Sequence, residues 1–101
     1  MVEIIWTPQS IEDMENIAEY ISKDSLKYAL IQVEDFFETA TILEHSPKVG
    51  RIVPELRKKN IRELFVGFYR LIYRINDNSK IDVLTVYHTS RHLKSKMLKK
   101  K

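Results

Sequence analysis

Cysteine is absent from this 101-residue sequence, and glycine and proline are scarce, at two and three residues. Without cysteine there is no disulfide, thiolate nucleophile or cysteine-ligated metal, and a reducing cytoplasm is the expected compartment. Two glycines cannot supply the clustered glycines of a P-loop or a dinucleotide fold. No run approaches the roughly 20 apolar residues of a membrane span, and acidic Glu3 argues against a signal peptide, so no membrane partner is expected.

The composition is that of a soluble globular chain, with 44% hydrophobic and 31% charged residues. The length predicts one domain, residues 1–101. A chain this short buries one modest core and has little spare volume for a deep ligand cavity, so no small-molecule substrate is expected.

Charge is divided unevenly along the chain. Residues 1–46 hold two basic and ten acidic side chains, a net charge of −8, whereas residues 47–101 hold fifteen basic and four acidic ones, a net charge of +11. Such an asymmetry predicts that the second half meets a polyanion, either a nucleic acid or an acidic protein. A dipolar domain with a solvated basic face is the alternative.

The first half predicts a short strand followed by two helices. Residues 2–6 are apolar and β-branched, which is typical of a strand. Thr7 and Pro8 form a helix start, and Asp24 or Ser25 caps a second helix, so that a short link joins the two as a hairpin. Apolar positions at helical spacing are Ile11, Met14, Ile17, Ala18 and Ile21 in the first helix, and Leu26, Ala29, Leu30, Val33, Phe36, Phe37, Ala40 and Leu43 in the second.

The second half predicts a loop and three strands. Pro47 ends the second helix and opens a basic loop that reaches residue 60. Gly67 offers a turn between the first two strands, and the turn formers at 76–79 join the last two. The lysine-rich tail, residues 93–101, is compatible with a frayed helix or with disorder. The three strand-like runs cover residues 61–68, 69–75 and 81–87.

The predicted fold is α+β in the order β-α-α-β-β-β, with the helical hairpin packed on one face of an antiparallel sheet. Alternation along the middle strand points Tyr69, Leu71, Tyr73 and Ile75 toward the helices. The opposite face is then open and carries Arg70 and Arg74.

Few residue types remain that could carry chemistry. His45, His88 and His92 lack metal-ligand spacing, so no metal or cofactor is expected, and no carboxylate pair or Ser–His–Asp set stands out. Arginine and tyrosine remain: guanidinium groups grip phosphate at two points, and tyrosine rings stack on bases. Surface ion pairs for the arginines and core packing for the tyrosines are the structural alternatives. The expected binding residues are Arg51, Arg62, Arg70, Arg74 and Arg91.

Four segments of the chain form an ordered set. They are WTPQSIEDMENIAEYI (residues 6–21), HSPKVGRIVPEL (45–56), IRELFVGFYRLIYRI (61–75) and VLTVYHTSR (83–91). Taken in order, these segments resemble the RelE/ParE superfamily of bacterial and archaeal toxins. Each segment alone is weak, but the set covers nearly the whole chain, and the superfamily has the same β-α-α-β-β-β order.

The resemblance implies a toxin of a type II toxin–antitoxin pair, with plasmid stabilization and growth inhibition as associated roles. An acidic or amphipathic segment of a cognate antitoxin would neutralise it by wrapping its basic surface. ParE-like members inhibit DNA gyrase without a hydrolytic site. RelE-like members cut ribosome-bound mRNA without a metal, so whether this chain is an enzyme stays open.

Residues that would serve an RNA endonuclease can be named from the same resemblance. Cleavage through the 2′-OH needs a base, an acid and cations on the phosphorane. Ser95 stands where RelE-like members usually carry a tyrosine, and the Pro47 to Arg51 loop looks closer to ParE, so the ParE-like branch is favoured. A non-toxic nucleic-acid-binding module is the further alternative. The endonuclease set would be His88, Arg62, Arg70, Tyr87 and Arg91.

Overall fold

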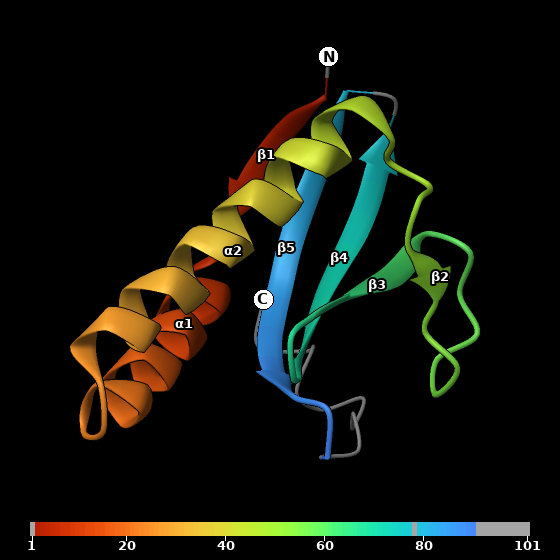
Figure 1. Ribbon diagram of the computed structural model, residues 1–101. Coiled ribbons are helices and arrows are strands. Elements are labelled where there is room, and N and C mark those ends of the chain that lie inside the picture. Colours follow the sequence, from red (N-terminus) through yellow and green to blue (C-terminus); the bar gives the residue numbers. More distant parts are fainter. Residues whose placement is uncertain (1, 78, 91–101) are drawn as a thin grey trace.

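The computed structural model describes residues 2–77 and 79–90, and one sheet with a helical hairpin accounts for them. Figure 1 shows the two helices side by side along the β1–β5 part of the sheet. None of the described helices has the length and apolar character needed to cross a membrane. The elements are β1 (Glu3–Trp6), α1 (Pro8–Ser22), α2 (Leu26–His45), β2 (Arg51–Ile52), β3 (Ile61–Val66), β4 (Tyr69–Asp77) and β5 (Lys80–His88).

The α+β class and the hairpin on one face of the sheet are confirmed, but the wholly antiparallel sheet is wrong. The strand order is β1-β5-β4-β3-β2, and β1 runs parallel to β5 with Ile4 beside Ile81. The other pairs are antiparallel. No tight turn joins β1 to β5, so chain connectivity does not impose an antiparallel direction on this pair.

The segment predicted as a loop from residue 47 to 60 contains an extra strand. In β2, Arg51 pairs with Glu63 and Ile52 with Arg62 of β3. Two residues are too few for an alternating pattern to show in a sequence. Gly50 precedes them where an added Cβ would lie 2.6 Å from the Glu63 carbonyl oxygen, so glycine is what lets the loop approach β3.

Capping and turn residues act as their types predict. The Thr7 hydroxyl accepts from the Ser10 amide at 3.2 Å and donates to the Val83 carbonyl at 2.7 Å, so it caps α1 and ties it to β5. Of the two alternatives for α2, Ser25 is the cap. Gly67, at φ 63°, begins the β3–β4 turn, which ends β3 at Val66 rather than at residue 68.

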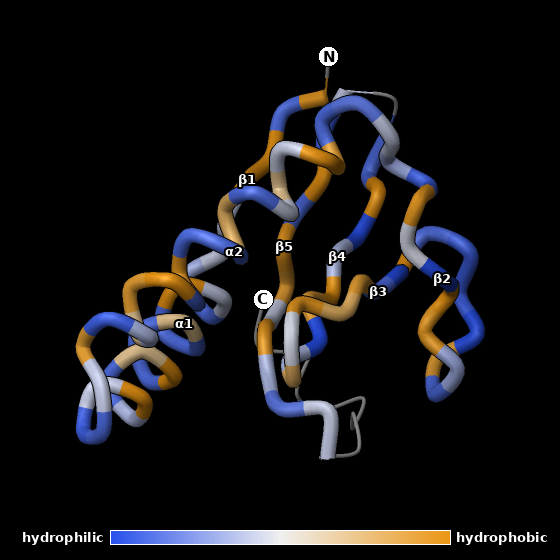
Figure 2. Tube along the Cα trace, in the orientation of Figure 1, coloured by the Kyte–Doolittle hydropathy of each residue, from blue (hydrophilic) through white to orange (hydrophobic). Residues whose placement is uncertain are grey.

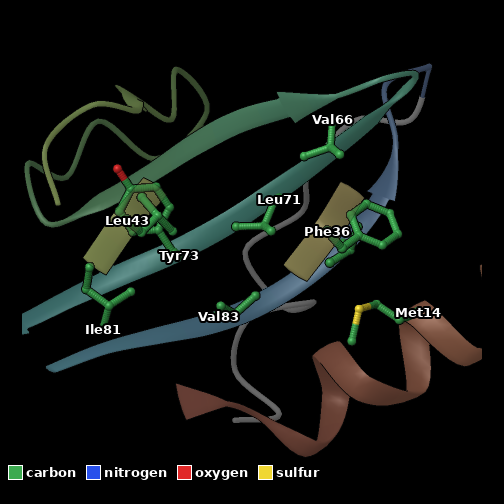
Figure 3. Close-up of a cluster of buried hydrophobic side chains, with 9 residues drawn as sticks. Met14, Phe36, Leu43, Val66, Leu71, Tyr73, Ile81 and Val83 are labelled. Carbon is green, nitrogen blue, oxygen red and sulfur yellow. The ribbon is translucent and has the colours of Figure 1, made fainter. Parts of the chain in front are cut away.

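The helix-covered face of the sheet holds the main core. Figure 3 shows Met14, Phe36 and Leu43 from the helices gathered over Leu71 and Tyr73 of β4, all of them buried. The alternation predicted for β4 is therefore confirmed. The predicted stripe of α2 is only partly buried, because three of its members are exposed: Leu26, Leu30 and Phe37.

The opposite face is covered as well, by the loop that follows β2. We call it the loop-covered face, and its apolar cluster comprises Val53, Ile61, Ile72, Leu84 and Tyr87, with Leu56 packed against it. Val53 and Leu56 belong to the segment predicted as a basic loop. The expectation that this face of β4 is open is therefore wrong.

Candidate functional site

Arg70 of β4 lies at the centre of a polar network on the loop-covered face. Its Nε donates to Glu63 at 2.6 Å, and its two terminal nitrogens donate to the carboxylate of Glu55, each at 2.9 Å. One of these also donates to the Tyr87 hydroxyl at 3.0 Å. The Arg70 side chain is only 7% exposed, so a phosphate reaches this guanidinium only by displacing a carboxylate.

Glu63 is the buried acid that organises this network. Its side chain has no exposed surface, and its second oxygen accepts from Nε of Arg51 at 2.5 Å. Arg51 itself is 59% exposed and lies over the Phe65 ring, 5.1 Å from the centroid. The hydrogen bonds that Arg70 donates to Glu55 raise the pKa of Arg70 above its ordinary value; burial opposes this rise, and Glu63 adds to it. The two arginines and two glutamates together are electrically neutral.

Tyr87 of β5 completes the network as a neutral group. Burial raises the pKa of its phenol to about 12, and the nearby Glu55 and Glu63 add to the rise that Arg70 opposes. The ring also lies under the Arg70 guanidinium, 5.4 Å from its central carbon. A phenol with this pKa is protonated at pH 7 and cannot serve as a base there.

Two further arginines, Arg62 and Arg74, are also held by the fold, whereas Arg57 in the loop is exposed. Arg62 donates to three backbone oxygens, those of Lys59, Lys48 and Gly50, at 3.0–3.3 Å. Arg74 pairs with Asp82 at 2.8 Å. Burial acts to raise the pKa of Asp82, but the hydrogen bonds donated by Asn76 and Arg74 outweigh burial, so the pKa is lowered. The described arginines thus do not form one open cationic face.

His88 lies at the end of β5 among aromatic side chains of the helix-covered face. It stacks on Phe68 at 6.4 Å and meets Tyr69 edge-on at 5.5 Å between centroids, while its Nδ1 is 2.8 Å from the Ser90 hydroxyl. Arg70 and Tyr87 point to the other face. Of the sequence-predicted endonuclease residues, Arg70 and Tyr87 are therefore in contact, while His88 lies on the other face and Arg62 is bound to backbone oxygens of the loop. Arg91 lies outside the described residues, as do Ser95 and the tail.

A cleft of about 490 Å³ opens beside His88, between α1 and the ends of β4 and β5. Asp13 at its wall accepts from the Thr85 hydroxyl and the Val86 amide, so this carboxylate serves to join α1 to β5. Burial, with a smaller contribution from Tyr20, raises the pKa of Tyr69. Besides Asp13, the cleft is lined by Asn16, Ile17, Tyr20, Tyr69, Val86, Tyr87, His88 and Ser90.

Sequence reasoning missed the glutamate partners and the cleft. The signal for Glu63 is present: a two-residue turn at Gly67 and Phe68 places residues 63 and 70 on the same face, diagonally across two strands. Glu55 lies in a loop, and the cleft depends on how α1 packs against β5. No local sequence pattern therefore predicts either the Glu55 contact or the cleft. Among residues 2–77 and 79–90 no cluster of histidines and acids could hold a metal ion.

Comparison with known proteins finds one matching family model and similar solved structures. The family model described as "ParE toxin of type II toxin-antitoxin system, parDE" matches residues 4–93. The chain is similar to a solved structure of the chromosomal ParDE system from P. aeruginosa, with 21% identity, a TM-score of 0.70, and coverage of 87% of this chain and 96% of the other. No curated protein matches the sequence.

A second solved structure is more distant in shape. It is the toxin–antitoxin complex RelBE2 from Mycobacterium tuberculosis, at 22% identity and a TM-score of 0.55, covering 86% of this chain and 96% of that one. At these identities the two structures show the shared fold, as the superfamily resemblance predicts.

Proposed function

Because the chain belongs to the ParE toxin family of type II toxin–antitoxin systems, we propose that it acts in the cytoplasm by binding and inhibiting DNA gyrase. A cognate antitoxin neutralises it, and both similar structures come from toxin–antitoxin systems, which supports such a partner. Growth inhibition and plasmid stabilization are the expected cellular consequences. The match over residues 4–93 carries the proposal.

The geometry of the described residues supports binding rather than RNA cleavage. Cleavage needs a base, an acid and phosphate-binding cations around one reacting group. Here Arg70 is neutralised by two glutamates, Tyr87 is a buried neutral phenol, and His88 lies on the opposite face of the sheet. A toxin that works by occupying its target needs none of these groups to act together.

The direct test is gyrase supercoiling of relaxed plasmid with increasing amounts of the purified chain. We expect supercoiling to fail, and the same chain to leave ribosome-bound mRNA intact. Full supercoiling at large excess, with codon-linked cuts in translated mRNA, would reject gyrase inhibition in favour of an endonuclease. His88→Ala and Arg62→Ala should then each lower cutting by about 10²–10³.

Induced expression tests the toxin role in cells. With the gene induced alone we expect growth to stop and DNA synthesis to fail first, and with the cognate antitoxin co-expressed we expect normal growth. Plasmid loss should fall when both genes are carried on the plasmid. Normal growth on induction, together with salt-sensitive nucleic-acid binding, would indicate a non-toxic binding module instead.

A further inference from the structure

Apolar side chains occur on more sides of α2 than the one that meets the core. One face is buried in the core, through Ala29, Phe36, Ala40 and Leu43. A surface helix ordinarily turns polar residues away from the core, and a helix that is apolar all round is normally buried. The exposed apolar residues of α2 are Leu26, Tyr28, Leu30, Ile31, Phe37 and Ile42, which we call the α2 apolar surface.

These six residues form two rows. At about 100° per residue, Leu26, Leu30 and Phe37 fall on one side of the helix, and the other three fall on the far side. Leu26 and Leu30 are 66% and 56% exposed, and Tyr28 and Ile42 are 63% and 53% exposed. A scattered single leucine needs no explanation, but two apolar rows on one helix mark an interaction surface.

An acidic row separates the two apolar rows. By the same helical spacing Glu34 and Glu38 lie between them, on the side of α2 turned away from the core, and both are exposed. Figure 1 shows α2 lying on the outside of the sheet, and Figure 2 shows hydrophobic and hydrophilic stretches alternating along the helix. Lys27 is the one lysine or arginine of α2.

The charge of this surface decides what can cover it. A second copy would set Glu34 and Glu38 against the same residues, and unpaired like charges at an interface are unfavourable. A segment with apolar residues on one face and lysine or arginine among them can pack on the two apolar rows and pair with Glu34 and Glu38. An amphipathic helix laid against α2 has that arrangement.

We propose that the α2 apolar surface docks a basic amphipathic helix of a partner protein. The inference rests on the exposure and charge of α2 and not on the identity of the toxin's target. It assigns an interface to the acidic half of the chain, whereas the sequence had pointed to the basic half as the surface that meets a partner.

The probe is a labelled peptide of about 18 residues, five helical turns, with leucine at helical i, i+3, i+4, i+7 spacing and lysine elsewhere. We expect fluorescence anisotropy to show saturable binding with a Kd on the order of 10 μM. A twin peptide with glutamate in place of lysine should bind at least about tenfold more weakly, since its charges oppose Glu34 and Glu38.

Three variants locate the interface. Leu30→Gln/Ile31→Gln and Glu34→Gln/Glu38→Gln should each weaken binding by about tenfold, as loss of central contacts does. Glutamine keeps the helix propensity, and circular dichroism checks the fold. Phe65→Gln is the matched control, because Phe65 is 54% exposed but lies on the loop-covered face, and it should leave the Kd unchanged.

Each other outcome overturns the proposal. Equal binding of the lysine and glutamate peptides, or an equal loss with Phe65→Gln, would show non-specific association. Sedimentation that shows a dimer of the chain alone, broken by Leu30→Gln/Ile31→Gln, would make a second copy the occupant. Gyrase inhibition is measured without the peptide, so failure there and failure here are distinguishable.

Discussion

The two faces of the sheet are buried in different ways. On the helix-covered face, α1 and α2 bring apolar side chains such as Met14 and Phe36 onto β4 and β5, and these form the larger apolar cluster. On the loop-covered face a segment without a helix lies over the sheet, and a buried network of Arg70, Glu63 and Glu55 lies beside a smaller apolar cluster.

This difference explains why arginines that look like ligand-binding residues are structural. A loop brings few apolar side chains, here Val53 and Leu56, so its position over the sheet depends on directional bonds. The fork of Arg70 joins Glu55 of the loop to Glu63 of β3 and Tyr87 of β5. A positive residue on a strand therefore does not by itself indicate a phosphate site.

The largest losses of stability should come from substitutions at the centre of either face of the sheet. Glu63→Ala removes the acid shared by Arg51 and Arg70 and should lower the free energy of unfolding by about 3–5 kcal/mol, because Arg70 stays buried. Phe36→Ala should cost a similar amount, about 3–5 kcal/mol, by leaving a cavity. Urea denaturation measures both, and Glu12→Ala on the surface of α1 is the control. A loss below about 1 kcal/mol for Glu63→Ala would show that the network is dispensable.

The double variant Arg70→Met/Glu63→Leu sharpens the comparison. Replacing a buried ion pair by apolar groups of similar volume is often neutral in stability, whereas removing one partner is not. We expect the double variant to recover most of the stability that Glu63→Ala loses. A double variant at least as unstable as the sum of Arg70→Met and Glu63→Leu alone would indicate that these charges do more than fill this face.

Gly50→Ala tests the close approach of the loop to the sheet. The new methyl group would meet the Glu63 carbonyl oxygen at 2.6 Å and the Tyr73 hydroxyl at 2.7 Å. That hydroxyl also donates to the Pro47 carbonyl, so the loop cannot shift without losing a bond. We expect a loss of about 1–3 kcal/mol in thermal unfolding. Wild-type stability would mean that the loop moves aside freely.

Thr7→Ala tests the helix-covered face at the start of α1. The substitution removes the cap of α1 and the hydrogen bond to the Val83 carbonyl. It should lower the free energy of unfolding, measured by urea denaturation, by about 0.5–2 kcal/mol. Thr7→Ser keeps the hydroxyl and should lose much less. Equal losses for serine and alanine would show that the methyl group, and not the hydroxyl, is what matters.

The last effect appears only at alkaline pH, where the stability of the fold should fall. Burial raises the pKa of Tyr87 to about 12, above the roughly 10 of an unfolded chain. The stabilisation from its neutral form is therefore complete below pH 10 and is lost as pH rises toward 12. Tyr87→Phe should show a shallower fall in the free energy of unfolding between these values. Identical slopes for the two proteins would contradict this.

The parts of the fold with local signals could be predicted from the sequence. Thr7 with Pro8 marks a helix start, Gly67 marks a turn, and alternation from Tyr69 to Ile75 identifies the face of β4 that meets the helices. All three are confirmed. The parallel pairing of β1 and the loop over β4 depend on contacts between distant segments. The partners of Arg70 depend on that loop, which is why an arginine expected on an open face is buried.

The most direct test of this account is gyrase supercoiling in the presence of Arg70→Met/Glu63→Leu, beside the wild-type chain at equal concentrations of folded protein. If Arg70 and Glu63 only hold the loop on the sheet and the toxin acts by binding, the two proteins should inhibit supercoiling over the same concentration range. A double variant that is fully folded and no longer inhibits, while the wild type does, would contradict it by placing the toxin's activity in the buried network itself.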